Sequence, residues 1–348
     1  MTSQNDDASS DDNEITAHLD RGWDHLAHGD LDKAGLSARQ LLEIDPESPE
    51  AFTLQGAIAA ARGEPGEALE HYQRAMDLDP EYVDPLLYAA EVHLGPDGDL
   101  DEALRLCDLA LDVAEEEDAF IDALLLKAEA QFEAGDEDGA RETVRELPPA
   151  DLPEVEHHLR AARVYIDLRD LDDAERHLQA ALARDAASTD ALHLMGLVYE
   201  ERGDARRMAQ AFLEVREADL LAPPPPWGVT AQRFEELAEA ALEELPAQIR
   251  KLIGNVPVMV ADYPSVELVA EGSDPRMMGF FSGTPLPEKS SLGGDGPHLD
   301  CIFLYQRNIE RYARTTAEVE EEIRRTVLHE TGHFFGLSEE DLEEMGLG

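Results

Sequence analysis

Between residues 14 and 220 the sequence repeats itself about every 34 residues. Each copy contains a turn, in most copies a Gly followed by an acidic residue, and five positions later an Ala, which is replaced by Met208 in the sixth copy. By subtraction, these later positions lie 34, 35, 37, 34 and 34 residues apart; they are Ala34, Ala68, Ala103, Ala140, Ala174 and Met208. The turn positions are Gly29, Gly63, Gly98, Gly135, Arg169 and Gly203. A fixed period of this length predicts a solenoid built from one repeated unit.

Further positions of the repeat indicate that the unit is a pair of helices. Gly56 and Gly196 stand where the first helix must be approached closely, and Tyr72 and Phe212 stand at a large-residue position of the second. The acidic turns HGDLD, DGDLD and RDLDD are expected to cap the second helices. The pattern resembles the tetratricopeptide repeat, which implies about six helix pairs stacked into an α-solenoid. The resemblance also implies a groove that binds a protein partner; a purely structural spacer is the alternative.

The segments on either side of the array differ from it in composition. Residues 1–13, MTSQNDDASSDDN, have neither an apolar run nor a positive charge, which argues against a signal peptide and predicts a disordered acidic tail. Residues 221–228, LAPPPPWG, contain four consecutive prolines, which end a helix and favour polyproline II. We therefore expect a repeat array over 14–220, a semi-rigid linker over 221–228 and a second domain over 229–348.

The second domain combines helix and strand signals. A helix is expected over 230–245, and the apolar runs VPVMVADY, MMGFFSG and CIFLYQ predict three strands. Between the last two runs, residues 283–298 are rich in Gly, Pro and Ser, and we expect a long loop beside the site. Tyr305 and His298 are candidates for stabilising an oxyanion, although a packed strand residue and a loop residue without a role are the simpler interpretations. The predicted fold class is mainly α, an α-solenoid followed by a small α+β domain.

The stretch HETGHFFGLSEED, residues 329–341, predicts a metal site with a general base. The thirteen residues before it contain no Pro or Gly, and apolar residues recur there at helical spacing. On a helix, His329 and His333 lie about 40° apart on one face, where one Zn²⁺ can take both imidazoles. Glu330 lies between them, at an angle that suits a general base rather than a ligand. The spacing is the H-E-x-x-H arrangement of zinc peptidases.

A third metal ligand is expected shortly after the motif. Gly336 permits a turn with positive φ, which would bring Glu339 back to the two imidazoles and leave a fourth position open to water. The alternative is that Ser338, Glu339, Glu340 and Asp341 form only the cap and acidic first turn of a last short helix. Glu339 is the preferred third ligand, and Glu340 and Asp341 remain open as alternatives.

Residues 229–348 resemble the small zincin-like metallopeptidases, the minimal zincins. The resemblance is carried by FEELAEAALEELP, NVPVMVADYP, MGFFSGTPL, IFLYQRNIERYA and VLHETGHFFGLSEEDLEEMG, and it covers about one third of the chain. It implies a Zn²⁺ cofactor held by His329, His333 and Glu339, and hydrolysis of peptide bonds with Glu330 as general base. Members of that family commonly have Asp at the position of Glu339; Glu is one methylene longer and offers the same ligand type.

Charge and cysteine content restrict the partners and the compartment. The chain has 78 acidic and 28 basic residues, a formal net charge of −50. Such a surface disfavours nucleic acid and anionic membranes and favours cationic partners, although a merely solvated acidic surface explains it equally well. No stretch reaches 18 apolar residues, so we expect no membrane span. Cys107 and Cys301 fall in different predicted domains, which predicts buried free thiols and a cytoplasmic protein.

Two functions from different classes follow. In the first, the chain is a zinc metallopeptidase acting on a peptide or protein, and the repeats recruit the substrate or a protein partner. In the second, the chain is a repeat scaffold or adaptor whose zincin-like domain binds metal without cleaving anything. Glu330 favours the first, because a purely structural metal site has no use for a general base.

Overall fold

The computed structural model describes the chain except residues 1–3, 97, 149–151, 254–255, 284–299 and 346–348. It divides into two compact units, Met1–Leu194 and Met195–Gly348. The division falls within one helix, so that the linker predicted at 221–228 lies inside the second unit.

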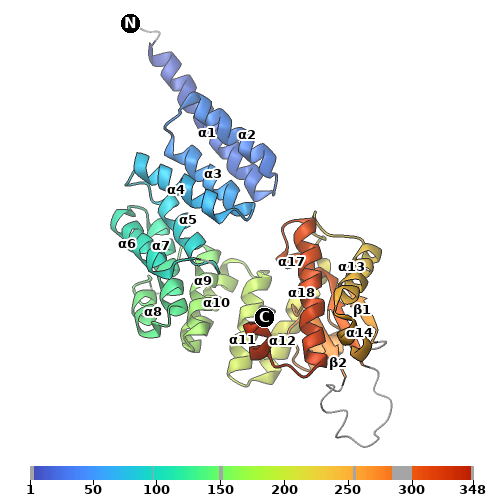
Figure 1. The fold of residues 1–348 in the computed structure, drawn as a ribbon. Coiled ribbons are helices and arrows are strands. Elements are labelled where there is room, and N and C mark those ends of the chain that lie inside the picture. Colours follow the sequence, from blue (N-terminus) through green and yellow to red (C-terminus); the bar gives the residue numbers. More distant parts are fainter. Residues whose placement is uncertain (1–3, 97, 149–151, 254–255, 284–299, 346–348) are drawn as a thin grey trace, which may run out of the picture. The chain divides into compact units, whose positions relative to one another are not determined.

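The first unit consists of consecutive helices connected by short turns, and neighbouring helices pack as antiparallel pairs (Figure 1). Their bounds are α1 Gln4–Ala27, α2 Leu31–Ile44, α3 Pro49–Ala61, α4 Pro65–Leu78, α5 Asp84–His93, α6 Leu100–Val113, α7 Glu117–Glu133, α8 Glu137–Val144, α9 Val155–Asp167, α10 Leu171–Arg184 and α11 Thr189–Glu201, which continues into the second unit. The predicted array of helix pairs is confirmed.

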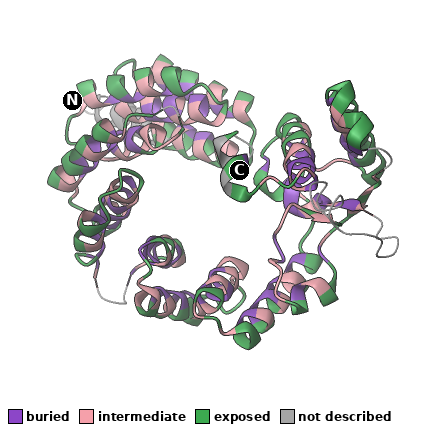
Figure 2. Ribbon diagram, turned by 60° about the horizontal axis from the view of Figure 1, so that its bottom comes forward, coloured by how far each residue is buried: buried purple, intermediate pink, exposed green. Residues whose placement is uncertain are grey.

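The repeated small-residue positions lie where helices meet. The five alanines are fully buried and Met208 is nearly so; they belong to α2, α4, α6, α8, α10 and to α12, Ala205–Leu221. Gly56 and Gly196 face the rings of Tyr72 and Phe212, and a Cβ at either glycine would collide with the ring. In Figure 2 the buried positions follow the faces on which paired helices meet. The period therefore reflects helix packing.

The predicted caps of the second helices are only partly correct. Asp99 accepts hydrogen bonds from the backbone N–H groups of Asp101 and Glu102, as expected of an N-cap. Asp30 and Asp170 make no such bond. Asp30 instead pairs with Lys33 at 2.8 Å. Asp204 accepts hydrogen bonds from both the N–H and the side chain of Arg207, so a nearby cation does not exclude capping, and the turn sequence alone does not decide it.

The N-terminal segment also differs from the expectation. Helix α1 begins at Gln4 and so includes residues 4–13 of the segment predicted to be disordered. Negative charge near a helix N-terminus is favourable, and the sequence has Asp6 and Asp7 there. Low hydrophobicity, on which the prediction of disorder was based, does not prevent a polar segment from extending a helix that is packed further along.

The second unit places helices around a small sheet. After α12 come α13 Ala231–Glu244, α14 Ala247–Ile253, β1 Val258–Ala261, α15 Val266–Ala270, β2 Gly279–Ser282, β3 Cys301–Tyr305, α17 Gln306–Tyr312, α18 Thr316–Phe334 and α19 Glu339–Glu344. The strand order is β1-β3-β2, with β1 parallel and β2 antiparallel to β3. The three predicted strands and the helix expected over 230–245 are present, and the fold class is confirmed.

The core of the second unit lies between the sheet, α13 and α18. Its buried residues include Phe234 on α13, Ile302 and Leu304 on β3, and Ile323 and Val327 on α18. This packing holds α18 alongside β2, the edge strand of the sheet. Within the residues that the structure describes, no helix combines the length and apolar character needed to cross a membrane.

Candidate metal centre

Helix α18 positions the predicted motif. The side chain of Thr315 accepts a hydrogen bond from the Glu318 N–H, and the carboxylate of Glu318 accepts one from the Arg314 N–H, a reciprocal cap that starts the helix. One face of the helix buries Val319, Ile323 and Val327 in the core. The remaining surface of its last two turns is therefore free to border a cleft.

A turn after α18 returns the chain to the helix. Gly336 has φ of 82°, the positive value expected from the sequence. The N–H of Leu337 donates to the carbonyl oxygen of Gly332, which closes the end of the helix. Gly332 also lies against the side chain of Leu342, so that α19 packs closely on α18. This turn brings Glu339, the first residue of α19, next to the motif.

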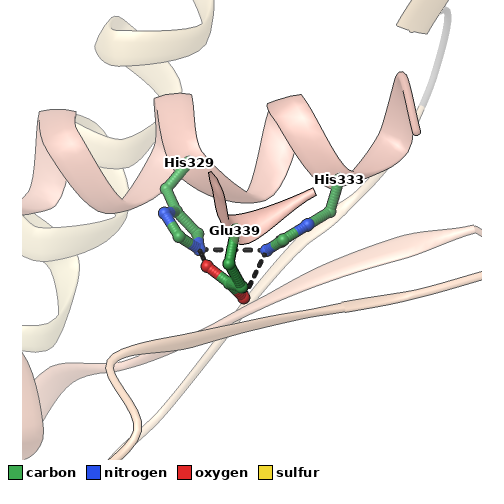
Figure 3. Close-up of side chains that lie close together, drawn as sticks. All are labelled: His329, His333 and Glu339. Atoms are coloured by element: carbon green, nitrogen blue, oxygen red, sulfur yellow. Dashed lines mark hydrogen bonds and ion pairs between the residues drawn. The ribbon is translucent and has the colours of Figure 1, made fainter. Parts of the chain in front are cut away.

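The side chains of His329, His333 and Glu339 converge on one point (Figure 3). The two Nε2 atoms are 3.0 Å apart. The carboxylate oxygens of Glu339 lie 3.5 Å from Nε2 of His329 and 3.2 Å from Nε2 of His333. Two ligand atoms that each lie about 2.1 Å from a tetrahedral metal are roughly 3.4 Å apart. The spacing of the three groups therefore fits a zinc ion.

The chemistry of the donors points the same way. Nδ1 of His333 lies 3.2 Å from the carbonyl oxygen of Leu337. A carbonyl can only accept, so Nδ1 carries the proton in the neutral ring and Nε2 presents a lone pair. This lone pair, the facing imidazole and a carboxylate meet within 4.8 Å. Such a set is satisfied by a cation, and two imidazoles with one carboxylate are a common set of zinc ligands.

The alternative acidic ligands are placed as follows. Asp341 accepts hydrogen bonds from the N–H and the hydroxyl of Ser338, so its carboxylate is engaged at the start of α19. These bonds hold the pKa of Asp341 below its usual value. The side chain of Glu340 lies outside the described residues. Glu339 is the acid that the structure brings to both imidazoles, and its role as ligand remains a prediction.

Glu330 lies beside this cluster and is only 5% exposed. Burial raises the pKa of its carboxyl to about 7, and the negative charge of Glu339 contributes to the rise; a hydrogen bond with the backbone of Phe281 acts in the opposite direction. Phe281 belongs to β2, so the carboxylate is held between α18 and the edge strand. A carboxylate with a pKa near neutrality is suited to taking up and releasing a proton.

A cleft of about 490 Å³ contains all four predicted site residues. Its walls are the last turns of α18 and the segment 277–281, which contributes Met277, Met278, Gly279, Phe280 and Phe281. The surface of the cleft is mainly apolar, next to a polar cluster at one end. A mainly apolar lining with a few polar groups is typical of a pocket that binds a ligand.

Two further residues that matter to the cleft, Arg325 and Gly279, were not predicted as site residues from the sequence. Arg325 lines it from α18, one turn before His329, and the i, i+4 spacing was a signal for it. Gly279 faces Glu330 so closely that a Cβ there would lie 2.7 Å from Oε1 of the carboxylate. This contact joins residues 51 positions apart by subtraction, so no local pattern indicates it.

Of the two oxyanion candidates, only Tyr305 belongs to the residues that the structure describes. His298 lies outside the described residues. Tyr305 is buried at 4% exposure at the end of β3 and is not among the residues that line the cleft. Burial raises the pKa of its phenol to about 12, with smaller contributions from Glu330 and Cys301. The simpler interpretation of Tyr305 as a packed strand residue is consistent with this position.

Comparison with known proteins supports both parts of the chain. Residues 253–348 match the family model of the zincin-like metallopeptidases, and residues 19–83 match a model of the tetratricopeptide repeat. The DnaJ homolog subfamily C member 7 homolog of Schizosaccharomyces pombe is 33% identical over 57 residues, which are 16% of this chain and 12% of that protein. The chain thus matches about one eighth of the length of this relative.

Solved structures resemble the repeats. PilW, a type IV pilus biogenesis factor, is 16% identical with a TM-score of 0.51, and the match covers 60% of this chain and 94% of PilW. PilF of Pseudomonas aeruginosa is 17% identical with a TM-score of 0.49, covering 61% of this chain and 95% of PilF. At these identities the likeness concerns the fold alone. The chain thus contains a segment of tetratricopeptide repeats, matched over residues 19–83, and a zincin-like metallopeptidase domain, matched over residues 253–348.

Proposed function

We propose that the protein is a zinc-dependent metallopeptidase whose repeats recruit a substrate or a protein partner. The observation that supports this most strongly is that His329, His333 and Glu339 converge beside a buried Glu330 in one cleft. A structural metal site is normally closed by four protein ligands. Three converging ligands next to a potential base are instead the arrangement of a catalytic site.

In this proposal the three metal ligands, Glu330 and Phe281 each have a defined task. Zn²⁺ held by the two imidazoles and Glu339 would supply Lewis-acid polarisation of the scissile carbonyl group and of a water molecule. Glu330 takes a proton from the attacking water and passes it to the leaving amine. Phe281 orients the Glu330 carboxylate through its backbone. The low exposure of Glu330 keeps bulk water from competing for its proton.

The edge strand β2 suggests how a peptide is bound. The carbonyl oxygen of Met278 accepts a hydrogen bond from the Tyr305 N–H on β3, so the backbone groups of Gly279, the next residue, face away from β3. An extended peptide can pair with such an edge by strand addition. Met277, Met278 and Phe280 make the adjoining wall apolar. We therefore propose a preference for an apolar residue beside the cleaved bond.

The repeats are proposed to bind a protein, as tetratricopeptide arrays do in other proteins. Holding a substrate on the same chain raises its effective concentration at the cleft. The net charge of −50 favours a partner with basic character and disfavours nucleic acid and anionic membranes. Cys107 and Cys301 are both free and buried, which suits the cytoplasm proposed from the sequence.

The test combines metal content with peptide hydrolysis. Wild type is expected to hold one zinc per chain and to cleave a generic peptide library in a chelator-sensitive manner. Changing both His329 and His333 to Ala should abolish both properties. Glu330→Gln should retain zinc, because Glu330 is not a ligand, while hydrolysis falls about 10²-fold or more. Glu321→Gln, an exposed substitution on the same helix, is the matched control and should change neither.

Three results would contradict the proposal. Stoichiometric zinc in the double His variant would disprove the metal site. Chelator-sensitive hydrolysis that is indifferent to Glu330→Gln would disprove the role of Glu330 as base. The third result is that wild type binds zinc and hydrolyses no peptide, both alone and with the partner bound by the repeats. This result would favour a scaffold with an inactive zincin-like domain.

A further inference from the structure

Helix α12 completes the repeat pattern but is packed against the zincin-like part of the second unit. Its residues Met208 and Phe212 form an apolar cluster with Val269 on α15. Nε of Arg216 donates a hydrogen bond of 2.6 Å to the carbonyl oxygen of Pro264. The last unit of a solenoid has an apolar face with no following repeat to cover it. Here α15 contributes to that cover, so the end of the repeats and the start of the zincin-like part share a core.

Asp219 is the most deeply buried charge of α12, with 3% exposure. One carboxylate oxygen lies 2.6 Å from Nη2 of Arg311 on α17, and the other lies 3.5 Å from Nε of Arg276. Its backbone carbonyl oxygen accepts a hydrogen bond of 2.8 Å from the hydroxyl of Tyr263. A buried carboxylate is tolerated only when it is paired, and this one is paired with two guanidinium groups from separate segments.

Arg276 connects this ion pair to the cleft. It is 8% exposed and directly precedes Met277, the first residue of the cleft wall. On the other side, Nδ2 of Asn308 donates to the carbonyl oxygens of Pro275 and Met277 at 2.8 and 2.7 Å. Asn308 is fully buried. The segment that leads into β2 is thus held by Asn308 on α17 and, through the Arg276 side chain, by Asp219 on α12.

We propose that Asp219 is a positioning residue for the cleft. Asp219 pairs with Arg276 and so determines where the segment 275–278 lies. Because this segment leads into β2, it also determines the position of the open edge of β2 and of the Phe281 backbone that contacts Glu330. The catalytic consequence of this inference rests on the proposed function; the structural consequence does not. A helix of the repeat pattern thereby contributes to the geometry of the zincin-like site, so the site is incomplete without residues that precede the proline segment.

The test uses the full chain with Asp219→Asn, which preserves size and removes the charge shared by the two arginines. The control is Glu217→Gln, which removes an exposed charge from the same helix. We expect faster hydrogen–deuterium exchange in residues 275–282, unchanged exchange in α18 and unchanged zinc content. Hydrolysis should fall by up to about 10²-fold, the effect of a misplacement of about 1 Å. The control should match wild type in all four measurements.

The exchange pattern decides the outcome. Unchanged exchange in 275–282 would overturn the proposal. An equal increase throughout residues 195–348 would also overturn it, because it would show a general loss of stability. If Asp219→Asn does not fold, Arg276→Gln tests the same connection and leaves the ion pair between Asp219 and Arg311 intact. If residues 275–282 of Arg276→Gln exchange as in wild type, the proposal is overturned. If wild type does not hydrolyse peptides, the proposed function fails, and the exchange data still decide the role of Asp219.

Discussion

A buried pair of histidines between α9 and α10 should make the stability of the repeats depend on pH. His158 and His177 are 0% and 4% exposed, and their Nδ1 atoms are 3.1 Å apart. Nη1 of Arg184 lies 3.1 Å from Nε2 of His158. Arg can only donate, so His158 accepts at Nε2, carries its proton on Nδ1 and donates it to Nδ1 of His177. Protonation of His177 would therefore place two N–H groups against each other.

The size of the effect follows from the pKa of His177. Burial lowers it to about 4, and the neighbouring His158 and Arg176 contribute in the same direction. In the unfolded chain this imidazole takes up a proton below about pH 6.5, whereas in the folded chain it does so only below about pH 4. The unfolded state binds more protons in this window, so stability falls as the pH decreases through it. The full loss is about 3 kcal/mol, of which about 2 kcal/mol falls between about pH 7.5 and pH 5.

The assay compares wild type with His177→Gln, which retains an acceptor for the Nδ1–H of His158 but does not titrate. Urea unfolding followed by circular dichroism at both pH values gives the free energy that each protein loses on acidification. Contributions from the many carboxylates are shared by the two proteins and cancel in the difference. Wild type should lose about 2 kcal/mol more than the variant. His28→Gln, at an exposed position, is the control and should behave as wild type. Equal losses in wild type and His177→Gln would refute the reasoning.

Two further predictions concern the helix and the strand that form the cleft. Gly279→Ala places a methyl group 2.7 Å from Glu330 and 2.8 Å from Thr326, so Glu330 should be displaced. Hydrolysis should then fall while the zinc content stays at the wild-type value. Undiminished hydrolysis would show that the contact is unimportant. Thr315→Ala removes the N-cap of α18 and should lower the free energy of unfolding of the second unit by about 1 kcal/mol, measured by urea unfolding. Thr315→Ser, which keeps the capping hydroxyl, should have the smaller effect.

The sequence alone was sufficient wherever a property depends on near neighbours in the chain. The period of the repeats is visible because each copy uses the same spacing between its turn and its buried small residue. The adjacency of His329 and His333 follows from four residues on one helix. The positive φ of Gly336 follows from the chemistry of glycine at the end of a helix. These features are local, and each could be predicted before any tertiary contact was known.

Some elements and local contacts could not be read in this way. Helix α17 follows β3 directly, and its Gln306 and Glu310 are buried because they hydrogen-bond to each other and to Val229. From the sequence, polar residues such as these are expected to be exposed. In the structure, partners from a distant segment satisfy their hydrogen-bonding groups, so they can be buried. Asp30 and Asp99 lie in nearly the same turn sequence, yet only the side chain of Asp99 caps its helix.

The tertiary structure alone decided the environment of the candidate site. Glu330 acquires its raised pKa from burial against β2, whose residue Phe281 lies far from it in the sequence. Gly279 matters because β2 pairs with β3 and passes beside α18. Asp219 belongs to a repeat helix by its spacing but is paired with arginines of the zincin-like part. Ligand spacing along one helix is a local property, whereas burial, pKa and the position of a supporting strand depend on which distant segments pack together.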